Sequence, residues 1–164
     1  MSVILDQAPA SPAAPVSAPS GALPAHLPAH LPSAARAVAT RVHANAMPSG
    51  AEAVLRRQLA PGFRNHDVLP GCAGGTDALV ATMHWFHDAF DEQRVEVLHA
   101  VTEGDLVALH VAFSALHSGF FLGVAPSHRR FTVREMHLVR VADGLEAEHW
   151  VMRDQVWWEH ELRR

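Results

Sequence analysis

The spacing of apolar residues in this chain changes from a helical to an alternating period at about Arg94. Upstream of that point, the apolar residues that recur at helical spacing are Leu79, Met83, Phe86 and Phe90. Downstream, apolar and polar residues alternate, which is typical of strands with one buried face. Helices that precede a run of strands in this order indicate an α+β fold, with the helices packed on one face of a sheet.

Turn and cap residues set the limits of the expected elements. We expect helices over 33–46, 51–59 and 76–90, with Ser33 and Thr76 as N-caps, and strands over 94–102, 105–117, 129–142 and 145–153. The segment FRNHDVLPGCAGG is expected to be a loop, and a short amphipathic segment follows over 155–162. The predicted architecture is a cone in which N-terminal helices pack on a curved, mainly antiparallel sheet that encloses a pocket.

The last two strands are predicted to form a hairpin around Asp143-Gly144, because this dipeptide favours a tight turn. Alternation assigns the faces of the first arm. One face carries Phe131, Val133, Glu135, His137, Val139 and Val141. Glu135 and His137 are therefore expected on the more apolar face, where Glu135 could hold the imidazole of His137 in one tautomer or raise its pKa.

The second arm of the hairpin has no clean apolar face. A bulge near Glu148 would turn Leu145 and Trp150 inward together. The pattern therefore leaves open the side on which His149 lies.

The composition indicates one domain over 33–164, because 164 residues with 49% hydrophobic content can bury a single core. Seven of the eleven prolines lie in residues 1–32, so this arm is expected to be disordered. The arm does not resemble a secretory signal, which favours a cytoplasmic protein. A formal charge of −4 with scattered basic residues argues against nucleic-acid or membrane partners.

The residue types that are absent restrict the chemistry. The chain has neither lysine nor tyrosine. A lysine Schiff base and a tyrosine oxyanion hole are therefore excluded, which leaves acid–base work to His, Asp and Glu. The single cysteine, Cys72, has no cationic neighbour in sequence and is not expected to be a nucleophile.

Thirteen histidines raise the question of a metal site. His84 and His87 are three residues apart on a predicted helix, but Asp88 and Asp91 do not complete an obvious ligand set. The HELRR segment lacks the second histidine of a zinc-protease helix. We predict no metal, and keep a histidine–metal protein as the third hypothesis.

Several separated motifs, in order, resemble the SnoaL-like polyketide cyclase family over about residues 35–162. These motifs are FRNHDVLPG, AFDEQRVEV, VTEGDLVALHV, LHSGFFLGVAP and DGLEAEHWVMRD. The resemblance implies the nuclear transport factor two-like cone. It also implies ring closure of a polyketide by intramolecular aldol condensation, with an aspartate as acid/base and without a metal or cofactor. One departure is QVWWEHEL, where family members often have a glycine-containing turn.

Carried over residue by residue, the resemblance assigns the acid/base to Asp154 and a catalytic histidine to His137. The residues it implies for the pocket are His66, His117 and Trp150, to which we add Glu135 and Phe86. Asp154 would need burial to raise its pKa, and it could instead cap the helix that follows. His137, His117, Trp150 and Asn65 could donate hydrogen bonds to an oxyanion.

The leading hypothesis from sequence is a cofactor-independent cyclase-like enzyme that acts on a small hydrophobic carbonyl compound and forms a homodimer. The second hypothesis is a non-catalytic dimeric domain of the same fold that binds a hydrophobic ligand.

Overall fold

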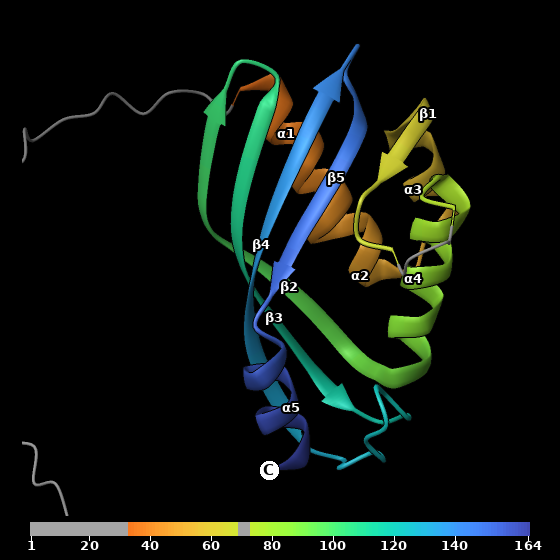
Figure 1. The fold of residues 1–164 in the computed structure, drawn as a ribbon, viewed down its shortest axis with the longest axis vertical. Helices are drawn as coiled ribbons and strands as arrows, with labels where there is room; N and C mark the ends of the chain where they lie inside the picture. Colours follow the sequence, from red (N-terminus) through yellow and green to blue (C-terminus); the bar gives the residue numbers. More distant parts are fainter. Residues whose placement is uncertain (1–32, 69–72) are drawn as a thin grey trace, which may run out of the picture. The chain divides into compact units, whose positions relative to one another are not determined.

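The computed structural model describes residues 33–68 and 73–164, and the expectations for the arm over 1–32 and for Cys72 lie outside the described residues. The helical elements along the chain are α1 (Ala34–Thr40), the π-helix η1 (Arg41–Ala46), α2 (Met47–Ser49), α3 (Glu52–Gln58), α4 (Thr76–Ala89) and α5 (Gln155–Arg163). The strands are β1 (Leu59–Asn65), β2 (Phe90–Glu103), β3 (Leu106–His117), β4 (Arg130–Ala142) and β5 (Leu145–Arg153), as Figure 1 shows.

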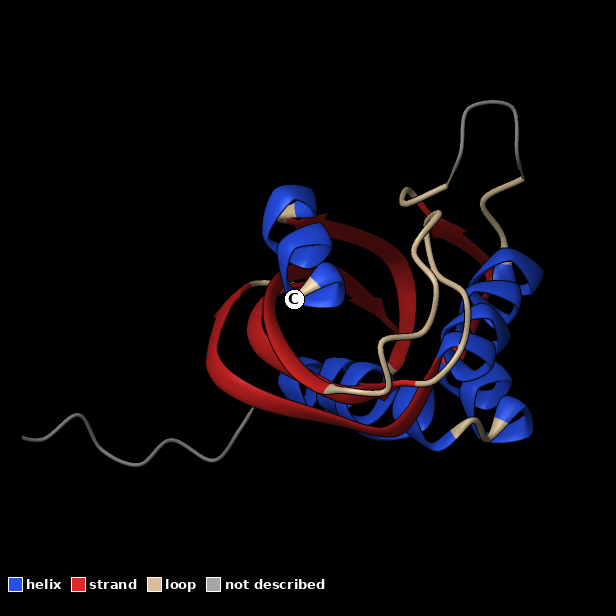
Figure 2. Cartoon of the chain, turned by 90° about the horizontal axis from the view of Figure 1, so that it is seen from below, coloured by secondary structure: helices blue, strands red, loops and turns tan. Residues whose placement is uncertain are grey.

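The five strands form one strongly curved sheet in the order β1-β5-β4-β3-β2 (Figure 2). Neighbouring strands are antiparallel except for β1 and β5, which are parallel. Helices cover one face of this sheet, so the α+β fold expected from the sequence is confirmed. None of the helices described is both long and apolar enough to cross a membrane.

Strand β4 shows the alternation that the sequence predicts. Its residues on one face are buried, including Glu135 and His137, whereas Met136 and Leu138 on the other face are exposed. The apolar residues of this face pack in the core, and Glu135 and His137 are buried with them because they share the same face.

The strand β1 differs from the loop expected for FRNHDVLPGCAGG, because residues 63–65 of that segment belong to the strand, and Pro61 and Gly62 lie in its middle. Proline is tolerated at the edge of a sheet, where its missing N–H removes no ladder hydrogen bond. β1 is such an edge strand, and it pairs with β5 so that Asn65 lies opposite His149. This parallel pairing places the end of the FRNHD segment beside the final hairpin.

A bulge in β5 settles the facing of His149. Arg140 pairs with Glu148, but the next residue of β4, Val141, pairs with Glu146, so β5 contains one extra residue here. The bulge lies where the sequence suggested, but it turns Glu146 and His149 inward, and both are buried. The expectation that Leu145 and Trp150 would face inward together is wrong, since Trp150 stacks on His66 with ring centroids 4.4 Å apart.

The first helix also departs from a regular period. Ser33 caps α1 as predicted, accepting a hydrogen bond from the backbone N–H of Arg36 at 3.1 Å. Residues 41–46 then form a π-helix, in which Val42 and His43 are both buried. At the start of α4 the N-cap is Gly75, and Thr76 is the first helical residue instead of the cap.

We expect Gly119→Ala to destabilise the fold. A Cβ at Gly119 would overlap the backbone oxygen of Asp88, while the Gly119 N–H donates to the oxygen of Ala89 at 2.9 Å. Relieving such an overlap costs about 1–3 kcal/mol. Urea unfolding should therefore show a lower midpoint than for Gly75→Ala, where an added Cβ meets nothing within 4 Å. Equal midpoints would contradict the close approach.

Candidate active site

Six of the seven buried polar residues among those described form one cluster inside the cone. The buried cluster consists of His43, Asn65, Glu135, His137, Glu146 and His149. They come from η1, β1, β4 and β5, so the cluster depends on the parallel edge strand and on the bulge in β5. Buried polar groups need partners, and in this cluster they are one another's partners.

A continuous chain of contacts runs through the cluster from Asn65 to Glu135. The Nδ1 atom of His149 lies 3.1 Å from Oδ1 of Asn65, and Nε2 of His149 lies 2.9 Å from Nδ1 of His137. The Nε2 atom of His137 lies 3.3 Å from the Glu135 carboxylate. The Asn65 oxygen also accepts the backbone N–H of Asp67 at 3.2 Å, which fixes the orientation of its amide.

Arg153 connects this series of contacts to Asp67, which lies nearer the surface. Its Nε donates to Glu135 at 2.7 Å, and its Nη1 donates to Asp67. The guanidinium carbon also lies 5.7 Å from the centroid of the Phe86 ring. The positive charge of Arg153 is thus held between one buried and one half-buried carboxylate.

His43 packs against both other histidine rings of the cluster. Its ring centroid lies 4.6 Å from that of His137 and 4.4 Å from that of His149. Its Nε2 lies 3.1 Å from the carboxylate of Glu146, whose side chain is fully buried. Glu146 therefore depends on His43 for the hydrogen bond that burial requires.

Burial and the contacts between side chains determine the charge states of His149, His137, Glu135 and Arg153. Burial lowers the pKa of His137 to about 4 and that of His149 well below its usual value. Burial alone would raise the pKa of Glu135, but the contacts with His137 and Arg153 outweigh it and lower that pKa. Glu135 is therefore ionised near neutral pH, beside a guanidinium whose own pKa is raised by Glu135 and Asp67 in spite of burial.

A small cavity beside the cluster adjoins an open groove. The inner cavity has a volume of about 40 Å³, and its lining includes His43, Glu135, His137 and Arg153. The groove measures about 880 Å³, within the roughly 300–1,000 Å³ typical of small-molecule sites. Three residues line both spaces, namely Thr82, Phe86 and Arg153.

Aromatic side chains form much of the groove wall. Trp85 and Phe86 come from α4, Phe121 from the connection between β3 and β4, and Trp158 from α5. Trp85 stacks on Phe121 with ring centroids 4.3 Å apart. A flat apolar molecule could lie in this groove with its polar end at Arg153.

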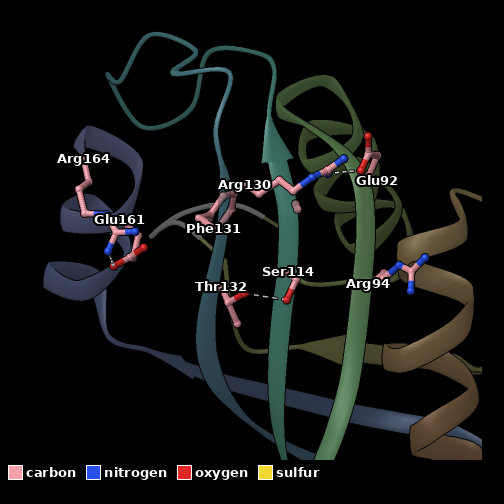
Figure 3. A pocket seen from close by; sticks show the side chains of 9 residues that line it. Glu92, Arg94, Ser114, Arg130, Phe131, Thr132, Glu161 and Arg164 are labelled. Atoms are coloured by element: carbon pink, nitrogen blue, oxygen red, sulfur yellow. Dashed lines mark hydrogen bonds and ion pairs between the residues drawn. The ribbon is translucent and has the colours of Figure 1, made fainter.

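A second large cavity lies away from the cluster, where β2, β3 and β4 meet the end of α5 (Figure 3). It has a volume of about 610 Å³ and shares no residue with the inner cavity. Arg130 pairs with Glu92 at its edge, and the hydroxyls of Ser114 and Thr132 lie 2.9 Å apart. Most of its polar groups pair with one another at the surface, so the buried cluster is the better candidate for chemistry.

The structure brings together three of the seven site residues proposed from the sequence, Phe86, Glu135 and His137. His66 and Trp150 lie on the other face of β5, where His66 contacts Glu148 at 2.9 Å. They are neither in the groove nor in the inner cavity.

Asp154 lies at the start of α5 and is exposed. Its carboxylate accepts a hydrogen bond from the backbone N–H of Trp157 at 3.0 Å. Asp154 therefore caps α5, which is the alternative to the acid/base role in the sequence analysis. The burial that a basic Asp154 would need is therefore absent.

His117 lies at the end of β3, apart from the cluster. The backbone N–H of Ser127 donates to its Nδ1 at 3.2 Å, so this buried ring fastens the connection between β3 and β4. Burial lowers the pKa of His117 below 6.5.

This shift predicts a pH dependence of stability. Because unfolded His117 binds a proton more readily than the folded residue, the free energy of unfolding should fall as the pH drops below about 6.5. Replacing His117 by Gln removes this proton uptake. Chemical unfolding at a series of pH values should then show a shallower loss of stability in acid than for the unchanged chain. An identical slope would contradict the assignment.

Sequence reasoning did not identify His43, Asp67, Glu146 or Arg153 as site residues. Glu146 faces inward because of the bulge, which alternation cannot show. His43 lies four residues after the buried Ala39, so helical spacing alone offered a signal for it. Arg153 lies on the same face of β5 as Val151 and His149, because alternate residues of a strand share a face. Once His149 is known to face inward, Arg153 is expected to face inward as well.

The fold agrees with the comparisons with known proteins. The family described as SnoaL-like polyketide cyclase matches residues 36–162. An aklanonic acid methyl ester cyclase from Streptomyces sp. (strain C5) is 31% identical over 100 residues, which are 60% of each chain. A nogalonic acid methyl ester cyclase from Streptomyces nogalater is 29% identical over 80 residues, covering 48% of this chain and 60% of the relative.

Solved structures show the same fold. IdmH from Streptomyces antibioticus has 26% identity and a TM-score of 0.68, covering 80% of this chain and 99% of that one. TsrD from Streptomyces laurentii has 25% identity and a TM-score of 0.68, covering 77% of this chain and 96% of that one. The chain therefore belongs to the SnoaL-like polyketide cyclase family. Its matches span about 60% of the length of these two curated relatives.

Proposed function

We propose that this protein is a cyclase that closes a ring in an apolar carbonyl compound by an intramolecular aldol reaction. The observation that carries the proposal is an ionised, buried Glu135 that contacts Arg153, a residue that also lines the aromatic groove. The carboxylate of Glu135 can accept a proton, and the adjacent guanidinium of Arg153 can stabilise the charge of an oxyanion. His137 contacts the same carboxylate at 3.3 Å and positions it.

The proposed reaction needs no added reactant. The Glu135 carboxylate takes a proton from the carbon next to a carbonyl group, and Arg153 stabilises the enolate oxygen. The enolate carbon then attacks a second carbonyl carbon of the same molecule, which forms the C–C bond and leaves an alkoxide. The proton held by Glu135 is returned to that alkoxide, so substrate and product are isomers.

The relatives support the substrate class. Two of them are named as cyclases of aklanonic acid methyl ester and nogalonic acid methyl ester. A groove with the rings of Trp85, Phe121 and Trp158 suits a flat molecule of that kind. In this proposal Asp154 remains the cap of α5.

The direct test is turnover of these two methyl esters by the purified full chain, followed by chromatography, because substrate and product have equal mass. We expect an isomeric product to appear faster than without protein. Saturable binding of both esters without any product would contradict the cyclase and favour the second hypothesis, a binding domain for hydrophobic ligands.

A further inference from the structure

The three histidine rings of the buried cluster are arranged as metal ligands would be. One ring nitrogen from each of His43, His137 and His149 lies within 4.8 Å of the other two, and all three residues are buried. We propose that these histidines bind one divalent transition-metal ion such as Zn²⁺. This inference goes beyond the proposed cyclase reaction and does not rest on it.

The first support is that each ring has one nitrogen paired with an oxygen. Nε2 of His43 faces Glu146 at 3.1 Å, Nε2 of His137 faces Glu135 at 3.3 Å, and Nδ1 of His149 faces Oδ1 of Asn65 at 3.1 Å. Metal-bound histidines almost always donate their second N–H to a carboxylate or carbonyl oxygen, which fixes the tautomer. All three rings have such a partner.

The second support is the contact between the two remaining nitrogens of His137 and His149. Once the outer nitrogens carry hydrogen toward oxygen acceptors, Nδ1 of His137 and Nε2 of His149 both present lone pairs, and they lie only 2.9 Å apart. Two lone pairs at this distance repel each other unless a cation lies between them. A metal ion that also binds the remaining nitrogen of His43 satisfies all three.

The charge around the rings favours a dication. The carboxylates of Glu135 and Glu146 contact two of the three rings, and Arg153 supplies one positive charge through its bond to Glu135. The Oε2 atom of Glu146 is buried and has no hydrogen-bond partner among the residues described. A metal ion beside His43 would compensate the negative charge that this carboxylate carries when ionised.

The geometry leaves a fourth position open. Around a tetrahedral zinc ion with Zn–N bonds of about 2.0–2.1 Å, ligand nitrogens lie roughly 3.3 Å apart. Binding would therefore widen the 2.9 Å contact and bring a ring nitrogen of His43 closer than its present separation of up to 4.8 Å from the other two. The inner cavity of about 40 Å³, which His43 and His137 line, has room for a water molecule as the fourth ligand.

The test is a titration of the tag-free full chain with Co²⁺ after dialysis against a chelator, followed by competition with Zn²⁺. Visible absorption of cobalt in a site of low coordination number should saturate at one ion per chain and disappear on addition of zinc. Replacing His149 by Gln should weaken binding more than roughly 100-fold, because even the loss of a ligand's hydrogen-bond partner costs about 10- to 100-fold. Glu146→Gln, which keeps all three ligands, should fall within that smaller range.

The matched control removes a histidine pair at the surface. His99 and His110 also face each other, with their Nδ1 atoms 3.1 Å apart, but this pair is not part of the buried cluster. The double variant His99→Gln/His110→Gln should bind cobalt as the unchanged chain does. Unchanged binding in His149→Gln, or loss of binding in the surface variant, would overturn the proposal. Since no substrate is present, failure of the cyclase assay would leave this result unaffected.

Discussion

Glu135→Gln should lower kcat for ring closure by roughly 100- to 10,000-fold, the usual contribution of a positioned acid–base group. The amide keeps the shape of the side chain but has no charge with which to accept a proton from carbon. Arg153 retains its contact with Asp67, so the groove should keep its form and KM should change little. Steady-state kinetics with either methyl ester measures both constants.

Asp154→Asn is the control that separates the two acid–base assignments. Asparagine caps helices about as well as aspartate, so α5 should remain stable. Turnover by this variant should match that of the unchanged chain. If Asp154→Asn lost activity while Glu135→Gln kept it, the assignment drawn from the family resemblance would be correct and the one drawn from the structure would fail.

His43→Ala should reduce the free energy of unfolding by about 3–5 kcal/mol, because it leaves a buried carboxylate without its partner. Glu146 is fully buried, and its contact with His43 at 3.1 Å is the only hydrogen bond of its carboxylate in the described part of the chain. Urea unfolding would measure the loss directly.

The control for His43→Ala is a variant in which both partners become apolar, His43→Leu with Glu146→Met. Replacing a buried charged pair by packed apolar side chains is often neutral or stabilising. The double variant should therefore be more stable than His43→Ala alone. If the two variants were equally unstable, the unpaired carboxylate of Glu146 would not be the cause of the loss.

Residue patterns predict most of the secondary structure and the part of the site that β4 contributes. The alternation in β4 places Glu135 and His137 inside, and Asp143-Gly144 forms the turn of the final hairpin. These features follow from local chemistry, namely the two-residue period of a strand and the conformational freedom of glycine.

The site residues outside β4 depend on interactions between distant segments. The burial of His149 and Glu146 follows from the bulge. Alternation and helical spacing assume regular elements, so one extra residue reverses or rotates the face that they predict. Asp154 shows a different limit, because an aspartate before a helix suits both capping and catalysis, and only its exposure distinguishes the two.

The pairing of β1 with β5 also has a consequence for how the chain folds during synthesis. Asn65 and His149 are 84 residues apart, yet they meet in adjacent strands of one sheet. Contacts of such high sequence separation form late, because a long loop must close first. As the ribosome releases the chain from its N-terminus, the edge of β1 that pairs with β5 must wait without its strand partner until the final hairpin emerges.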